Sequence, residues 1–404
     1  MLDKTLFFES QISLSRIVHE KYDFCLESIE KALEINSENL DYYLSYLEVN
    51  YNKTKTESDL DKIKLYKFED LVKLSSVESV SKPLLEYIGT LKAKYKSRVL
   101  VRLDLALTQG QAFKDLVREY LGNQIKQNIP SVFINIKFIY KIQQNKIEIL
   151  EELVSEFLAD LKAYNKIEIS KKNGEKLILD LVPEFIWVYF FAAQHYDFLR
   201  NLEKAFEMIN LAIDKTPSVV EFYMVKSKIL EHAGLYEKAA EAYEKAKKLD
   251  LGDRYLNAKY SKKLVRLSNV DKANEIMKDF VREPLIDENI DHFQNMWYET
   301  DCAYAYLRDK NFVRAHRLFN SIAFHFTTII EDQFDFYNYC LRRFMINDFA
   351  NVLEHMDKIL NNKDVFKMIN GMELLLKFLE LEKDKAALEK KVVNELIIFS
   401  FLSF

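Results

Sequence analysis

The sequence predicts an all-α protein, a right-handed solenoid of stacked helical hairpins, on three observations. The chain of 404 residues holds only 7 glycines and 5 prolines, too few turn formers for an all-β protein. Its residues are 49% hydrophobic and 30% charged, which suits amphipathic helices joined by short loops. Similar segments recur 34 residues apart, the spacing of tetratricopeptide hairpins. Since one hairpin cannot bury its apolar face alone, roughly three or more must stack.

The repeats are clearest between residues 183 and 345. Ala205, Ala239 and Ala273 occupy the same position in three successive segments. A small residue on the second helix of each hairpin lets the paired helices approach closely, and bulky residues fill the space between hairpins. A fourth repeat carries Ala315 and is displaced by an eight-residue insertion. We therefore predict at least four stacked hairpins in this block.

The rest of the chain predicts helices with one interruption. Asn173-Gly174 lies between two short alternating runs, which indicates a β-hairpin turn, although an exposed charged loop is also compatible. Residues 97–104 predict either an extended connector or the start of a helix. The predicted parts are N-terminal helical repeats (1–96), a central helical segment (97–165), an exposed loop or hairpin (166–182), the tetratricopeptide block (183–345) and C-terminal capping helices (346–404).

Charge, cysteines and hydropathy predict a cytoplasmic protein that does not enter a membrane. A net charge of −5 gives no overall attraction to nucleic acid, so DNA is not an expected partner. Cys25, Cys302 and Cys340 are odd in number and lie in apolar surroundings, so we interpret them as reduced, buried thiols. The N-terminus lacks the pattern of a secretory signal. The apolar run at 185–193 has about nine residues, fewer than the roughly 20 that span a bilayer.

No catalytic motif stands out. The seven histidines have no metal-binding spacing, and the chain contains no Cys-x-x-Cys, no glycine-rich phosphate loop, no nucleophile elbow and no acetyl-CoA-binding motif. We predict that the chain is not an enzyme and holds no metal ion or intrinsic cofactor. An enzyme with an unrecognised site is the alternative. His195 and Tyr196 lie at or beside helix-packing positions, and we interpret them as core residues.

The predicted helix at 253–267 has a basic face. At 100° per residue, four cations and a tyrosine hydroxyl fall within about a third of its circumference, with no acidic residue among them. Such like charges repel each other by roughly a few tenths of a kcal/mol per pair, and a bound polyanion relieves that repulsion. The face predicts a site for a phosphate-rich molecule, ribosomal RNA or an acidic peptide; a solvated basic face is the alternative. The candidate residues are Arg254, Tyr255, Lys259, Lys262, Lys263 and Arg266.

Several stretches resemble one known family. DRYLNAK (253–259) and EDQFDFYNYC (331–340) are much more specific than a repeat consensus, and the stretches 185–217, 228–266 and 293–315 carry the same likeness. They resemble the auxiliary, tetratricopeptide scaffold subunit of the N-terminal acetyltransferase A complex. The likeness covers roughly residues 100–345, and residues 1–60 match only as generic repeats. This chain is much shorter than typical members of the family.

The resemblance implies a non-catalytic scaffold that wraps a catalytic acetyltransferase subunit and reshapes its peptide site. That complex acetylates the α-amino group of nascent chains and docks on the ribosome. The family also holds inositol hexakisphosphate at the subunit junction. The matching positions here are Arg254, Tyr255, Lys259, Lys262, Lys263 and Arg266.

Two expectations follow for partners. We expect the catalytic subunit to contact the first helices of the repeats in 183–340 and the helix around 331–343. A generic tetratricopeptide adaptor that binds peptides for a chaperone or for RNA processing is the alternative. Such an adaptor needs no inositol phosphate.

Overall fold

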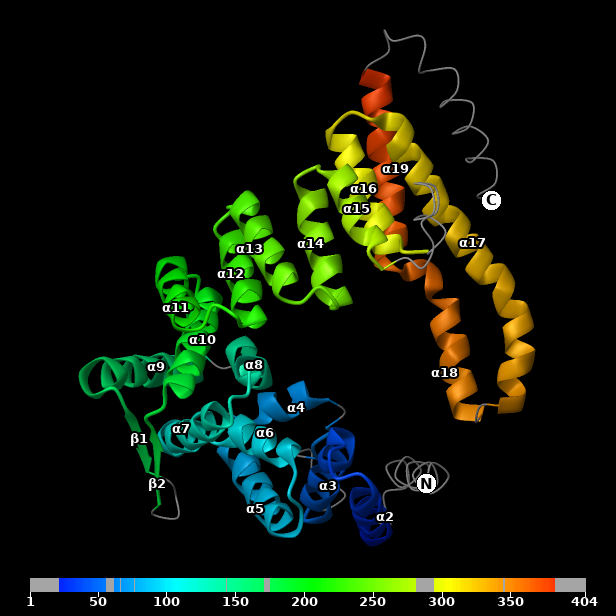
Figure 1. Cartoon of the computed structure of the whole chain (residues 1–404). Coiled ribbons are helices and arrows are strands. Elements are labelled where there is room, and N and C mark those ends of the chain that lie inside the picture. Colours follow the sequence, from blue (N-terminus) through cyan, green and yellow to red (C-terminus); the bar gives the residue numbers. More distant parts are fainter. Residues whose placement is uncertain are drawn as a thin grey trace. The chain divides into compact units, whose positions relative to one another are not determined.

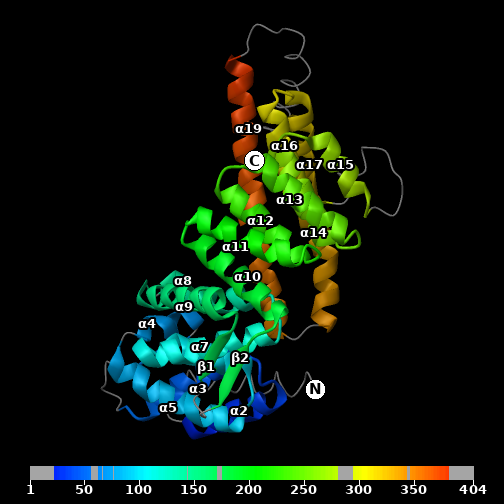
Figure 2. The same ribbon diagram turned by 60° about the vertical axis from the view of Figure 1, so that its left-hand side comes forward.

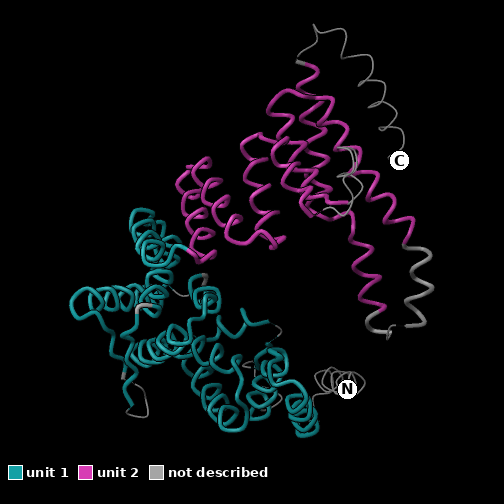
Figure 3. Tube along the Cα trace, in the orientation of Figure 1, with its two compact units in different colours: residues 1–217 teal, residues 218–404 magenta. Residues whose placement is uncertain are grey.

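The computed structural model describes residues 22–55, 62–65, 67–75, 77–142, 144–170, 175–280, 294–343 and 346–381. The chain divides into two compact units, Met1–Pro217 and Ser218–Phe404 (Figure 3). In both units the described residues are mainly helical, and their only sheet has two strands (Figure 1, Figure 2). None of the described helices is long and apolar enough to cross a membrane.

The first unit begins with helices that share one apolar core. Side-chain caps explain where two of them start, because Asn39 accepts the N–H of Asp41 and Ser97 accepts the N–H of Val99. Buried residues from all five helices, including Leu33 of the first, belong to this core. The helices are α2 (Tyr22–Ile35), α3 (Leu40–Lys53), α4 (Phe68–Leu74), α5 (Glu78–Lys94) and α6 (Arg98–Leu107).

A β-hairpin packs on helix α7 in the second half of this unit. Its strands are antiparallel, with Ile167 opposite Leu179, and the side chains on one face are buried. Gly122 of α7 makes room for the hairpin, since a Cβ at this position would collide with Ile169 and Leu177. The elements are α7 (Gly110–Lys126), α8 (Val132–Ile142), α9 (Gln144–Tyr164), β1 (Ile167–Ser170), β2 (Lys176–Leu179), α10 (Val182–Phe198) and α11 (Leu202–Lys215).

The second unit continues the hairpins. Each of its first three hairpins pairs consecutive helices, and α19 then packs against α16 and α17. The elements are α12 (Val220–His232), α13 (Tyr236–Leu249), α14 (Arg254–Arg266), α15 (Val270–Lys278), α16 (Met296–Arg308), α17 (Phe312–Arg343), α18 (Ile346–Asp357), η3 (Ile359–Asn361) and α19 (Lys363–Leu381).

The predicted small residues lie in the core. Ala205, Ala239, Ala273 and Ala315 lie on the second helices of their hairpins, and each is fully buried. The four predicted hairpins are therefore present, as α10–α11, α12–α13, α14–α15 and α16–α17. The boundary between the two units falls after Pro217, inside the predicted repeat block. The five-part division of the chain stays a prediction.

Each of these four hairpins turns through one left-handed residue. Arg200, Gly234, Ser268 and Lys310 have φ values of +63°, +77°, +59° and +57°. After each of them, the next backbone N–H bonds back to a carbonyl five residues earlier, as from Asn269 to Leu264 at 2.9 Å. This is the Schellman geometry, which satisfies carbonyls at the end of the first helix. Only one of the four positions is glycine, so the other three hold a strained conformation.

Other predictions can be compared with these elements. The all-α class with one short hairpin near 166–181 is confirmed, and residues 98–104 belong to helix α6, with Ser97 as its N-cap. The hairpin is exposed on one face only, because Ile167, Ile169, Leu177 and Leu179 bury the other. Its turn at Asn173-Gly174 lies outside the described residues. Cys25 and Cys302 are buried and form no disulfide within the described part, in which the side chain of Cys340 is not included.

A buried lysine joins α9 to the end of α6. The Lys146 Nζ donates to the carbonyls of Leu105 and Ala106 at 2.7 and 2.8 Å, and it lies 4.6 Å from the centre of the Phe113 ring. Burial lowers the pKa of Lys146 to about 7, against the opposing effect of the Asp104 charge. The neutral amine still has two N–H groups for the two carbonyls.

We predict that Lys146→Met removes a pH dependence of stability. Between pH of about 7 and the usual lysine range, the unfolded chain holds a proton that the folded chain lacks. The free energy of unfolding contributed by Lys146 therefore rises across this window and is flat below it. Urea unfolding at pH 6 and pH 9 measures the change, which Lys146→Met should reduce and the exposed Lys162→Met should preserve. Equal changes in wild type and Lys146→Met would contradict the assignment.

We also predict that glycine stabilises the strained turns. Arg200→Gly should raise the free energy of unfolding by up to about 1 kcal/mol, because glycine tolerates positive φ. Gly234→Ala should lower it by about 1 kcal/mol through backbone strain alone, since open space surrounds that position. Thermal unfolding measures both, with Arg200→Ala as the control that keeps the strain. If Arg200→Gly is no more stable than Arg200→Ala, the strain does not limit stability.

Candidate functional site

The basic helix predicted from the sequence is α14, and its neighbours fix which side it exposes. The Asp253 side chain caps it by accepting the N–H of Tyr255 at 2.7 Å. Leu256, Tyr260 and Leu264 are buried, because α14 packs against α13, α15 and α16. The opposite side carries the six candidate residues, of which Lys259 and Lys263 are half-buried and Arg254, Tyr255, Lys262 and Arg266 are exposed.

Four of the six candidates line one pocket. This α14 pocket has a volume of about 490 Å³ and lies within the second unit. Six cationic side chains and two acidic ones line it, so the excess of positive charge strongly favours an anion. The cations are Lys259, Lys262, Lys263, Arg266, Arg308 and Lys367, and the acids are Glu231 and Asp301.

The two acids come from neighbouring hairpins. Glu231 of α12 forms ion pairs with Lys263 and, at 3.5 Å, with Arg266, while Asp301 of α16 lies 3.2 Å from Lys262. Helix α14 itself contributes no acid, as predicted, but the fold supplies two from outside it. Lys259 forms no ion pair within the described part of the chain. The basic face is therefore neutralised only in part.

The protonated form of one lysine of the pocket, Lys263, is disfavoured by its surroundings. Burial lowers the pKa of Lys263, and the charges of Lys259 and Arg266 act in the same direction. The hydrogen bond and charge of Glu231 oppose this lowering. A bound anion would oppose it as well, since any nearby negative charge favours the protonated amine.

Aromatic rings hold these cations in place. The Arg266 guanidinium lies 3.9 Å from the centre of the Tyr236 ring, and Lys262 lies 5.4 Å from the Trp297 ring. Lys263 is 5.3 Å from the Tyr243 ring. Such contacts attract the cation and restrict its rotamers. The charged groups are thus arranged before any ligand arrives.

Two candidates lie outside the pocket. Arg254 is 5.7 Å from the ring of Phe280, and Tyr255 lies under Lys259 at 5.2 Å. Neither lines the pocket. Tyr255 is 53% exposed, so both side chains remain at the surface of the same helix.

Sequence reasoning missed Arg308, Lys367 and Tyr304. Arg308 had a usable signal, since it follows Arg266 by one repeat plus the eight-residue insertion. Its guanidinium caps α14 by donating to the carbonyl of Val265 at 2.8 Å and to that of Arg266 at 3.4 Å. Lys367 lies on α19, outside the repeats, where the Tyr304 hydroxyl donates to its carbonyl at 2.8 Å.

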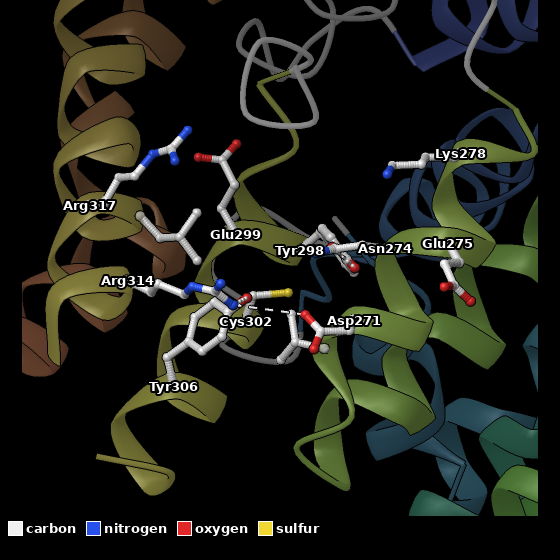
Figure 4. A pocket seen from close by; sticks show the side chains of 12 residues that line it. Asp271, Asn274, Glu275, Lys278, Tyr298, Glu299, Cys302, Tyr306, Arg314 and Arg317 are labelled. Atoms are coloured by element: carbon white, nitrogen blue, oxygen red, sulfur yellow. Dashed lines mark hydrogen bonds and ion pairs between the residues drawn. The ribbon is translucent and has the colours of Figure 1, made fainter. Parts of the chain in front are cut away.

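A second pocket in this unit has equal numbers of acidic and basic side chains. It has about 380 Å³ and lies between α15 and the α16–α17 hairpin. Figure 4 shows Asp271 facing Arg314 across it, an ion pair of 3.8 Å. Three acidic side chains line it against three basic ones, so it does not select an anion. They are Asp271, Glu275, Glu299, Lys278, Arg314 and Arg317.

Among the described residues, no group of three His, Cys, Asp or Glu side chains could hold a metal ion. His195 is fully buried, with Nδ1 at 2.8 Å from the Tyr140 hydroxyl. Burial lowers the pKa of His195 to about 4, so the ring is neutral near pH 7. The interpretation of His195 and Tyr196 as core residues is confirmed. Of the expected partner-binding helix at 331–343, side chains beyond Asp332 lie outside the described part.

Comparison with known proteins gives consistent matches. A family model described as N-terminal acetyltransferase A, auxiliary subunit, matches residues 1–396. The mouse protein named N-alpha-acetyltransferase 16, NatA auxiliary subunit, is 32% identical over 312 residues, which are 77% of this chain and 36% of the mouse protein. The Arabidopsis thaliana N-terminal acetyltransferase A complex auxiliary subunit NAA15 is 31% identical over 264 residues, 65% of this chain and 29% of that protein.

A solved structure gives the same fold. A chain of the structure of Naa15/Naa10 bound to HypK-THB matches 94% of this chain with a TM-score of 0.75 at 24% identity. The match covers 52% of that chain, so this protein spans only part of the length of its relatives. Since the family model matches nearly all of the sequence, as the resemblance predicted, the chain belongs to the family of N-terminal acetyltransferase A auxiliary subunits.

Proposed function

We propose that this chain is the non-catalytic auxiliary subunit of an N-terminal acetyltransferase complex and binds a catalytic acetyltransferase subunit. The family match over residues 1–396 is the observation that carries the proposal. The stacked hairpins support it as well, because helical repeats of this kind present extended surfaces to partners. The described residues contain no catalytic constellation that we recognise. The acetyl-CoA site and the catalytic base then belong to the partner.

The proposal includes the setting of the reaction. The complex acetylates the α-amino group of nascent chains in the cytoplasm, in association with the ribosome. The scaffold holds the catalytic subunit and reshapes its peptide site. A partner that covers several hairpins at once can do this, since each hairpin is positioned only by its neighbours.

We further propose that the α14 pocket binds inositol hexakisphosphate. The residues present fit such a group, since six cations line the pocket and at least three of them are held against aromatic rings. Glu231 and Asp301 already form ion pairs with three of these cations, so a weakly charged ligand gains little there. A ligand with many phosphates can engage Lys259, Arg308 and Lys367 in addition to the three cations paired with Glu231 and Asp301. This makes a polyphosphate a better fit than a single phosphate.

We predict that inositol hexakisphosphate raises the thermal stability of the chain. At about 100 times the dissociation constant, binding adds about 2.7 kcal/mol, which corresponds to a rise of several degrees in Tm. Lys259→Glu with Lys262→Glu should abolish the rise, because the two changes invert charges in the pocket. The control is Lys238→Glu with Lys245→Glu on α13, which changes the net charge equally outside the pocket. A rise that persists in the pocket variant would show that the ligand binds elsewhere.

We also predict a stoichiometric complex with the catalytic subunit. Co-expression of the full chain with the Naa10-type subunit of the same organism should yield one peak of equimolar composition in size-exclusion chromatography. Acetyl transfer to peptides with a small first residue should require the catalytic subunit, and this chain alone should transfer none. Separate elution of the two proteins would overturn the scaffold proposal. Activity of this chain alone would show instead that it is an enzyme.

A further inference from the structure

A groove in the first unit has no role in the function proposed above. It lies between α6, α7 and the start of α8 and has a volume of about 770 Å³, within the range of ligand sites. All of its lining residues belong to the first unit, so it is separate from the α14 pocket. We call it the α6–α7 groove.

Two arginines one turn apart on α6 face this groove. Arg98 and Arg102 are both exposed, and neither forms an ion pair with any residue that the structure describes. The Arg102 guanidinium lies 5.5 Å from the centre of the Phe68 ring and 5.8 Å from that of Phe138. Two rings therefore hold Arg102 in position and leave its N–H edge available for a carboxylate, which guanidinium groups bind through paired hydrogen bonds.

A tyrosine hydroxyl lies near the same two charges. Burial raises the pKa of Tyr120, while a hydrogen bond with Asn135 and the charges of Arg102 and Arg98 lower it. Tyr120 lines the groove together with both arginines. Together they provide several donors around a single small anionic group.

Carboxamide side chains line the next part of the groove. Asn123 and Gln124 lie on α7, are half-buried, and make no side-chain hydrogen bond within the described residues. Asn135 on α8 donates to the Ser131 hydroxyl at 3.3 Å. A carboxamide carries both a donor and an acceptor, so it matches the N–H and C=O groups of an extended peptide.

The acids of the groove argue against a polyanion. Glu38 and Glu119 line it, and Glu38 accepts the backbone N–H of Arg98 at 3.2 Å. The third cation of the lining, Lys92, forms an ion pair with Asp104. Two carboxylates beside two available guanidinium groups disfavour a chain of phosphates, whereas a single carboxylate on an uncharged backbone meets little repulsion.

We propose that the α6–α7 groove binds an extended polypeptide segment of a partner protein. Arg98 and Arg102 hold an acidic side chain of that segment, and Asn123 and Gln124 hydrogen-bond its backbone. The site is independent of the catalytic subunit and of the α14 pocket. Its test uses the full chain alone, so its outcome does not depend on the scaffold function.

The experiment uses an array of immobilised random octapeptides, each made with Glu or Gln at its fourth position. Bound full-length chain is quantified with an antibody to a terminal tag. We expect the Glu form to retain about tenfold more chain than the Gln form, as a net gain of about 1.4 kcal/mol implies. Arg98→Gln with Arg102→Gln should reduce this ratio to about one.

Two further variants separate the parts of the site. Asn123→Ala with Gln124→Ala should weaken binding to the Glu and Gln forms by the same factor, because these side chains contact the backbone of the peptide. Lys162→Gln with Lys215→Gln, an equal charge change on exposed lysines of the same unit, should leave the ratio unchanged. Circular dichroism on every variant checks that the helices are intact.

Three results would overturn the proposal. One is an equal signal for the Glu and Gln forms with wild-type chain. Another is a Glu preference that survives in the double-arginine variant. The third is tighter binding of a labelled single-stranded RNA decamer than of any Glu octapeptide, with loss of that binding in the double-arginine variant, since the groove would then be a nucleic-acid site.

Discussion

The structure depends on one constraint, which is that no helical hairpin of this chain can bury its apolar face by itself. A buried alanine in each of four hairpins lets the two helices of that hairpin approach closely. These residues are Ala205, Ala239, Ala273 and Ala315. Each hairpin then exposes a broad apolar side that only the next hairpin can cover. Stability is therefore shared between neighbours, and the α14 pocket is assembled from more than one hairpin.

The α14 pocket shows this sharing in its charges. Helix α14 brings four cations, but Glu231 arrives from α12, Asp301 and Arg308 from α16, and Lys367 from α19. Arg308 also binds the last carbonyls of α14, so one residue contributes to the pocket and to the end of the helix that forms it. The electrostatics of the pocket thus depend on the stacking of the hairpins and not on one helix.

The sequence could predict the repeated hairpins and the features of single helices. The 34-residue spacing was sufficient for the hairpins and their buried alanines, and the helical wheel placed the cations of α14 on its exposed side. The wheel treats a helix in isolation, so it could not supply Glu231 or Lys367, which are near only because other hairpins bring them there. Short elements were harder, because α4 has seven residues and the alternation at 97–104 suits a strand as well as α6. The burial of the β-hairpin also escaped prediction, since it depends on the missing side chain of Gly122 in a distant helix.

The insertion between α15 and α16 has an evolutionary consequence. It displaces the following repeat by eight residues along the sequence, yet α14 still packs directly against α16 and Arg308 still reaches the end of α14. The contact between α14 and α16 thus tolerates the longer segment that joins their two hairpins. A lineage can lengthen or shorten such joining segments without altering the charges displayed on the first helices. Alignment by position in space will therefore recover relationships between the ligand-binding residues of such proteins that counting along the chain misses.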